Sequence, residues 1–326
     1  MPRGHVLGVD GGGSATRSVI ISTGGEVIAT AQAGPSNPIT MGSERALASI
    51  LEAVDEASAR CGVQEFLASR LGVAGTDRSR LRQELLAGMR SSFGDTAIVS
   101  DAASALAGGT GCRPGVVVIA GTGSIAYGEN SLGQTARAGG WGWRLGDEGS
   151  GYTIGLKAIM AALRAHDGRG PETVLEQKIV SHLGLGRLED IIDWVYEPGR
   201  EPRDIAYLVP IVREAEAEGD EAAALVMAEA GAELGFVANA VIRRLDMSGE
   251  FPVSLNGGVF KQPSGYIFAF EEVVRREAPL CALIKPRMPP LLGSGLLALR
   301  SLGVTVDEAL LRRVEKSYMR LGEAHE

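Results

Sequence analysis

Apolar residues cluster in short runs that end at glycines. Residues 6–10 form the first run, and residues 18–22 and 27–31 form two more on either side of a turn at Gly24 and Gly25. Short apolar runs bounded by glycine are typical of β-strands. The chain is therefore expected to open with a three-stranded meander.

Helical spacing then alternates with further apolar runs. Ser43 is expected to cap a helix whose apolar positions include Leu47, Ile50 and Val54 and which ends at Gly62. The next predicted elements are a strand at 71–74, a helix at 79–90, a strand at 97–100 and a helix at 102–107. A meander followed by alternating helices and strands predicts a mixed α/β layer.

The opening pattern recurs after a turn at residues 113–115, which is the best candidate for a domain boundary. A strand at 116–120 leads into a second glycine turn, and both turns lead into another strand. The matching residues, at one constant offset, are Gly11, Gly13 and Ser14 in the first copy and Gly121, Gly123 and Ser124 in the second. We interpret the chain as two related halves. Chance recurrence is the alternative, because glycine is common here.

The second half is mostly helical. Helices are predicted at 151–165, 171–182 with Pro171 in its first turn, 188–196, 203–216 and 221–245, strands at 251–255 and 281–285, and closing helices at 291–302 and 307–321.

Composition narrows the class of protein. The 326 residues are 45% hydrophobic and 22% charged, which excludes wholesale disorder and suits two domains. The 45 glycines, about twice the average share, predict tight turns or close backbone approach. A net charge of −8 argues against a nucleic-acid partner. It leaves an anionic ligand possible, because backbone N–H groups can bind phosphate.

Three scattered cysteines and short apolar runs indicate the compartment. Cys61, Cys112 and Cys281 share no metal-ligand spacing, so a zinc ribbon or iron–sulfur centre is not expected. No apolar run approaches the about 20 residues of a membrane helix, and the N-terminus lacks the pattern of a signal peptide. We expect a cytoplasmic protein without a membrane partner.

Two glycine turns and one carboxylate are candidates for phosphate chemistry. Asp10 ends a strand before the first glycine turn (residues 11–14), where it could hold Mg²⁺ through water. The alternative is a glycine-rich hairpin with a capping aspartate. The second glycine turn (residues 121–124) also carries the hydroxyl groups of Thr122 and Ser124. The alternative interpretation of this segment is a plain tight turn. Asp101 follows the strand at 97–100, where a carboxylate can act as general base or as a helix N-cap.

A third candidate is the segment at residues 139–151, here called the tryptophan loop. It contains six glycines, two of the three tryptophans, Asp147, Glu148 and Arg144. Aromatic faces beside carboxylates suit a polyhydroxylated ring, which packs on the aromatic and donates to the carboxylate. A flexible surface loop is the alternative. The four histidines show no metal-binding spacing and are interpreted as surface or structural residues.

Five motifs occur in the order that marks a known family: GVDGGGSATRSVI, VSDAASALAGGTG, VVVIAGTGSIAYG, GGWGWRLGDEGSGYTIG and SLNGGVF. Together they resemble the N-acetylglucosamine kinase family, also called the BadF/BadG/BcrA/BcrD ATPase family, of the actin–hexokinase–Hsp70 superfamily. The resemblance implies an α/β fold of two RNase-H-like, actin-like domains with a ligand cleft between them. The first domain would span 1–115 with the helices at 291–326 packing back on it, and the second 116–290. A homodimer is also implied.

The resemblance assigns roles residue by residue. It implies ATP with Mg²⁺, the metal near Asp10, and transfer of the γ-phosphoryl to a sugar 6-hydroxyl whose proton Asp101 accepts. The nucleotide contacts would be Gly12, Gly13, Ser14 and Thr16, then Gly121, Thr122, Gly123 and Ser124, with Gly257 and Gly258 as the adenosine turn. The sugar contacts would be Asn37, Gly75, Thr76, Asp101, Gly140, Trp141 and Asp147, with Glu148 as a rival for the role of Asp147.

The first turn departs from the family, because it has Ser-Ala-Thr where Thr-Lys-Thr is frequent and so lacks a lysine near phosphate. The leading hypothesis is an amino-sugar kinase acting on N-acetylglucosamine, with glucosamine and N-acetylmuramic acid as alternatives. An activator ATPase would need cluster-ligating cysteines. A sugar sensor without turnover would lack the base or one phosphate turn.

Overall fold

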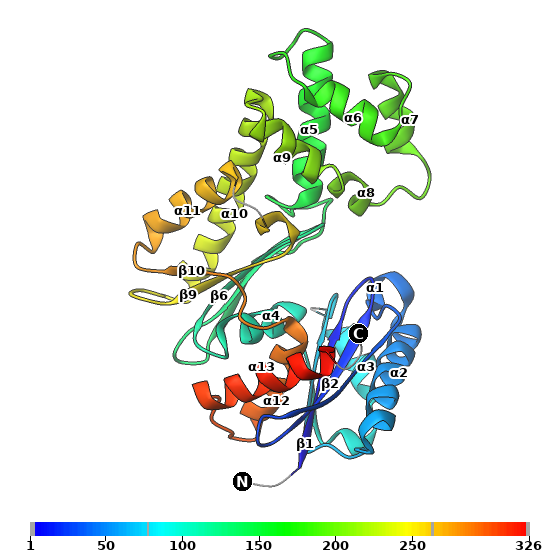
Figure 1. Cartoon of the computed structure of the whole chain (residues 1–326), viewed down its shortest axis with the longest axis vertical. Coiled ribbons are helices and arrows are strands. Elements are labelled where there is room, and N and C mark those ends of the chain that lie inside the picture. Colours follow the sequence, from blue (N-terminus) through cyan, green and yellow to red (C-terminus); the bar gives the residue numbers. More distant parts are fainter. Residues whose placement is uncertain (1–3, 77, 262–263, 324–326) are drawn as a thin grey trace. The chain divides into compact units, whose positions relative to one another are not determined.

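The computed structural model describes residues 4–76, 78–261 and 264–323. The chain forms two compact units (Figure 1). The first unit is Met1–Gly115 with Lys285–Glu326, and the second unit is Val116–Ile284. The chain leaves the first unit after Gly115 and returns to it at Lys285.

The first unit contains a five-stranded sheet in the order β3-β2-β1-β4-β5. Its strands are β1 (His5–Gly11), β2 (Thr16–Ser22), β3 (Val27–Ala33), β4 (Ala68–Val73) and β5 (Asp95–Val99). The first three strands are the antiparallel meander predicted from the sequence, and β4 and β5 join β1 in parallel. The carboxyl ends of β1, β4 and β5 consequently meet at one edge of the sheet.

The second unit repeats this topology. Its sheet has the order β10-β9-β6-β7-β8. Read from β8 to β10, this order matches the first sheet, with β6, β7, β8, β9 and β10 in the places of β1, β2, β3, β4 and β5. The strands are β6 (Gly115–Ala120), β7 (Ser124–Glu129), β8 (Thr135–Gly139), β9 (Pro252–Asn256) and β10 (Ala282–Ile284). The two related halves and the α/β class expected from the sequence are therefore confirmed.

Both faces of the first sheet are buried. Its helices are α1 (Pro38–Met41), α2 (Ser43–Cys61), α3 (Ser79–Ala87), α4 (Asp101–Thr110), α12 (Pro290–Ser301) and α13 (Glu308–Glu323), with a short 3₁₀ turn, η1 (Ser91–Phe93). Because side chains alternate along a strand, Val6 packs with α12 and α13, whereas Leu7 packs with α2. Helix α12 approaches β1 closely: a Cβ on Gly8 would lie 2.5 Å from the Gly295 nitrogen.

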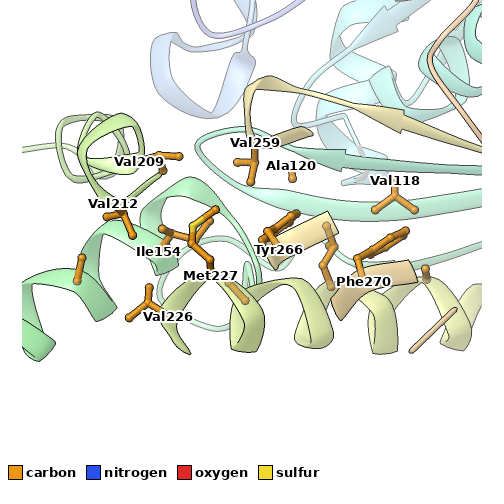
Figure 2. Close-up of a cluster of buried hydrophobic side chains, with 14 of the residues drawn as sticks. Val118, Ala120, Ile154, Val209, Val212, Val226, Met227, Val259, Tyr266 and Phe270 are labelled. Carbon is orange, nitrogen blue, oxygen red and sulfur yellow. The ribbon is translucent and has the colours of Figure 1, made fainter. Parts of the chain in front are cut away.

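One large core fills the second unit (Figure 2). Its helices are α5 (Gly151–His166), α6 (Leu175–Leu183), η2 (Leu188–Asp190), α7 (Ile191–Tyr196), α8 (Pro202–Ala206), α9 (Val209–Ala217), α10 (Glu221–Arg244), η3 (Gly258–Phe260) and α11 (Gly265–Glu277). Among the described residues, α10 alone is long and apolar enough to cross a membrane. Of its apolar window, 56% is buried against the rest of the protein, as expected of a core helix.

Several predicted elements are wrong in detail. Ser43 is the first residue of α2, and Gly42 precedes it as the N-cap. Helix α6 begins at Leu175, because the Asp220 carboxylate accepts hydrogen bonds from Thr173 Oγ1 and Val174 N ahead of it. The helix expected at 203–216 is two helices, since Pro210 lacks an N–H and lies in the first turn of α9. Helix α11 is missing from the sequence-based prediction.

Candidate functional site

The first glycine turn joins β1 to β2 at the edge of the sheet where the parallel strands end. A hydrogen bond from Gly12 N to Ala15 O, 3.0 Å long, closes the turn. Gly13 and Ser14 are exposed, and no atom lies within 4 Å of where a Cβ on Gly13 would be. The outer side of this turn therefore has room for an anion. Thr16 is fully buried, and its hydroxyl donates to Gly34 O at 2.7 Å, so it supports the turn from behind.

Two carboxylates stand beside this turn. Asp10 is at the end of β1, and Asp101 is the first residue of α4. Burial raises the pKa of Asp10 to about 6, Arg17 opposes the rise, and the nearby Asp101 carboxylate adds to it. The N-cap role weighed for Asp101 belongs to Ser100, whose hydroxyl accepts from Ala103 N at 3.2 Å.

The loop residues expected to contact sugar meet at the same edge. Gly75 follows β4 with a φ of +81°, and a Cβ there would lie 2.6 Å from Asn37 Oδ1. The same amide oxygen accepts from Ile39 N and caps α1. Ala74 N donates to Gly11 O at 2.8 Å, which ties this loop to the first glycine turn. Thr76 is fully buried, and its hydroxyl donates to Val73 O at 2.7 Å.

In the second unit, the second glycine turn is held by the start of α5. Gly121 N donates to Gly123 O at 2.9 Å within the turn. Gly151 N donates to Gly121 O at 2.8 Å, and Tyr152 N donates to Thr122 O at 3.2 Å. Thr122 is exposed, so its hydroxyl is accessible to a ligand.

Asp147 connects the tryptophan loop to this turn. It is 7% exposed, has a φ of +62°, and lies so close to Gly123 that a Cβ there would be 2.8 Å from Asp147 Oδ2. Burial raises the pKa of Asp147, and hydrogen bonds from the backbone of Ser124 and Gly142 oppose the rise. The Ser124 hydroxyl donates to Glu148 O at 2.7 Å and adds a second tie. The second glycine turn and the tryptophan loop are thus in direct contact within this unit.

The tryptophan rings of the loop are exposed and stacked on arginines. Trp141 is 64% exposed, and the Arg137 guanidinium carbon lies 4.7 Å from its ring centroid. Arg144 lies 4.8 Å from the Trp143 ring in the same way. Gly140, with a φ of +68°, donates its N–H to Ser124 O at 2.9 Å. The loop therefore presents an aromatic face on an anchored base, which suits packing against a sugar ring.

The turn at Gly257 and Gly258, which the resemblance leads us to expect at the adenosine and which is called the adenosine turn for that reason, lies against the strand that precedes the second glycine turn. Gly257 has a φ of +104°, and a Cβ there would lie 2.2 Å from Ala120 O, so only glycine fits. Gly258 is exposed with open space around it. Arg213 donates to Gly258 O and Val259 O and so holds the turn. Sequence reasoning missed Arg213, because its contact spans 45 residues.

The carboxylates of the first unit suit a magnesium ion. Asp10 and Asp101 interact electrostatically, and a divalent cation would offset the repulsion between these two carboxylates and the cost of burying the charge of Asp10. No group of three or more His, Cys, Asp or Glu side chains is arranged for a metal within the part of the chain that the structure describes. Mg²⁺ usually keeps waters and substrate phosphate oxygens beside one or two carboxylates, so this sparse donor set fits it.

Comparison with known proteins finds sugar kinases among the relatives of this chain. The chain is 36% identical over 299 residues to the N-acetylmuramic acid/N-acetylglucosamine kinase of Clostridium acetobutylicum, covering 90% of this chain and 98% of that protein. It is 32% identical over 313 residues to the N-acetyl-D-glucosamine kinase of Dictyostelium discoideum, with coverage of 90% and 98%.

A solved structure from Chromobacterium violaceum, assigned as an N-acetylglucosamine kinase, superimposes with a TM-score of 0.71 at 28% identity. The superposition covers 90% of this chain and 98% of the chain in the solved structure. The likeness confirms the expected actin-like fold class. The profile of the BadF/BadG/BcrA/BcrD ATPase family matches residues 7–298, and the chain belongs to this family.

Proposed function

We propose that the protein transfers the γ-phosphoryl group of ATP to the 6-hydroxyl of an amino sugar, with N-acetylglucosamine as the leading substrate. Membership of an ATPase family implies the use of ATP. The observation that carries the proposal is the pair Asp10 and Asp101 beside an open glycine turn. Phosphoryl transfer depends on positioning and on charge stabilisation, and this pair offers a metal ligand and a base.

Each side chain then has a distinct task. Asp101 accepts the proton of the attacking hydroxyl. Mg²⁺ held near Asp10, when bound, neutralises charge on the phosphate oxygens. Backbone N–H groups of the two glycine turns orient the phosphates, and Gly257 and Gly258 accommodate the adenosine. The sugar packs on Trp141 and is held by Asn37, Gly75, Gly140 and Asp147, whereas Thr76, being fully buried with its hydroxyl bonded to Val73 O, supports the loop that carries Gly75.

The relatives' substrates guide the choice among amino sugars. The Dictyostelium discoideum relative is named for N-acetylglucosamine, and the Clostridium acetobutylicum relative for N-acetylmuramic acid as well. N-acetylglucosamine is common to both names and therefore leads. N-acetylmuramic acid and glucosamine are the alternatives within the same reaction class, and an activator ATPase is the alternative outside it.

A coupled ADP-release assay across a sugar panel tests the proposal. We expect ADP release that depends on sugar and is fastest with N-acetylglucosamine, compared with glucosamine, N-acetylmuramic acid and glucose. ADP release independent of every sugar would favour the activator ATPase. Sugar binding without ADP release would favour a sensor. We also expect a homodimer, which sedimentation velocity on the same preparation checks.

A further inference from the structure

Tyr266 is the largest fully buried side chain of the second unit and touches two predicted ligand segments at once. Its hydroxyl donates to Gly149 O in the tryptophan loop at 2.7 Å. Its ring meets the Phe260 ring edge-on, with centroids 5.5 Å apart, and Phe260 ends the turn that begins at Gly257. Figure 2 shows Tyr266 in the same cluster as Val259 and Ala120.

The loop side of this contact has little freedom. Gly149 has a φ of +74°, and a Cβ there would lie 2.5 Å from Ala230 O on α10. The next residue, Ser150, caps α5 by accepting from Thr153 N at 3.2 Å. The Tyr266 hydroxyl is therefore bonded to a closely confined part of the tryptophan loop, two residues from Asp147.

The nucleotide side is held as firmly. Arg213 donates to Gly258 O and Val259 O, the two residues before Phe260, and so ties the adenosine turn at the point where the Phe260 ring begins. Phe260 also meets Phe270 edge-on at 5.6 Å, one turn further along α11 from Tyr266. A displacement of the adenosine turn reaches Tyr266 through contacting rings.

We propose that Tyr266 is a positioning residue that couples nucleotide binding at the adenosine turn to the order of the tryptophan loop, so that each ligand strengthens binding of the other. The inference rests on the proposed function. Coupling between two sites is reciprocal and typically amounts to a factor of about 5 to 150 in affinity. A contiguous chain of packed groups provides the physical route.

Calorimetric titration of N-acetylglucosamine, with and without a non-hydrolysable ATP analogue, tests this coupling. We expect the wild type to bind the sugar at least about five times more tightly when the analogue is present. Tyr266→Phe keeps the ring but removes the donor to Gly149 O. In this variant the increase in sugar affinity caused by the analogue should fall below about twofold, while affinity for the analogue alone changes little. Phe260→Leu removes the ring contact between Tyr266 and the adenosine turn, so this variant should also lose the increase in sugar affinity.

Asn239→Leu is the matched control. Its Nδ2 donates to Val273 O at 2.9 Å in a buried bond between α10 and α11, and neither partner belongs to the tryptophan loop or the adenosine turn. The control should keep the full gain in sugar affinity even where its melting temperature changes. The coupling inference is overturned if both Tyr266→Phe and Phe260→Leu keep the full increase in sugar affinity, or if the wild type binds the two ligands independently. Neither result would affect the proposed function. A wild type that binds neither ligand contradicts the proposed function itself.

Discussion

The carboxylate of Asp147 lies against the backbone of Gly123, where a β-carbon would come within 2.8 Å of Asp147 Oδ2. The second glycine turn and the tryptophan loop therefore support each other. A side chain at Gly123 would disturb both segments, so Gly123 is a poor position for testing phosphate contacts alone. Gly13 and Gly121 are better, because no atom lies within 4 Å of a Cβ at either residue.

Gly13→Val and Gly121→Val should each weaken binding of an ATP analogue by at least about tenfold. A branched side chain blocks backbone approach to phosphate, which is the basis of anion binding at such turns. Sugar affinity and melting temperature should change little, because both positions are open. Gly24→Val, in the hairpin between β2 and β3, is the control and should bind both ligands normally. Calorimetry of the three variants decides whether the turns hold the nucleotide.

Asp147→Ala should raise the KM for sugar and lower the melting temperature together. Its carboxylate accepts hydrogen bonds from the backbone of Ser124 and Gly142, and bonds to a charged group contribute about 1.5–3 kcal/mol each. Glu148→Ala is the control, and its effect on both quantities should be small. If Glu148→Ala raises the KM for sugar more than Asp147→Ala does, the roles of these two carboxylates are reversed.

Local patterns predict strand β1 because both of its faces are buried. Val6, Leu7 and Val9 are all fully buried, since β1 is covered on both faces, and this produces the apolar run seen in the sequence. The recurrence of glycine and serine after β1 and β6 likewise predicts a repeated topology, which the two strand orders confirm.

Elements that depend on distant contacts are harder to predict. The start of α6 is fixed by Asp220, which is 46 residues from Val174 in the chain. The link from Asp147 to Gly123 requires a non-glycine residue at positive φ. This conformation is uncommon even for aspartate, which is enriched in it, so the sequence alone does not mark the position. Helix α11 is different, because its buried residues Tyr266, Phe270, Val273 and Val274 have helical spacing that is visible in the sequence.

Asp101→Asn should reduce turnover by about 10²- to 10⁴-fold, the usual effect of losing a positioned base. The amide keeps the shape of the side chain, so affinity for N-acetylglucosamine should stay within about threefold of the wild type. Because Ser100 caps α4, the melting temperature should also be nearly unchanged. Steady-state kinetics and calorimetry check both parts. Retention of more than about a tenth of wild-type kcat would exclude Asp101 as the base.

Asp10 should make the metal-free protein less stable as pH rises. Its pKa is about 6 in the folded protein against 3.8 for an ordinary aspartate, so the folded state binds more protons between these values. The free energy of unfolding therefore decreases with pH across this window, by up to about 3 kcal/mol for a shift of this size. Asp10→Asn removes this contribution.

Urea denaturation in a chelating buffer measures the effect of Asp10. The variant and the wild type should be about equally stable at pH 4, and the variant should be more stable at pH 7. The same variant should lose activity with Mg²⁺ and ATP, because the amide is a poor metal ligand. A difference in stability that stays constant from pH 4 to pH 7 would show that Asp10 titrates normally.

The most direct test of the proposed kinase is ³¹P NMR of the protein incubated with ATP, Mg²⁺ and N-acetylglucosamine. We predict a phosphomonoester resonance that is coupled to the protons of the sugar C6 and grows in step with ADP. Inorganic phosphate as the sole new resonance, or no consumption of ATP, would contradict phosphoryl transfer to the sugar.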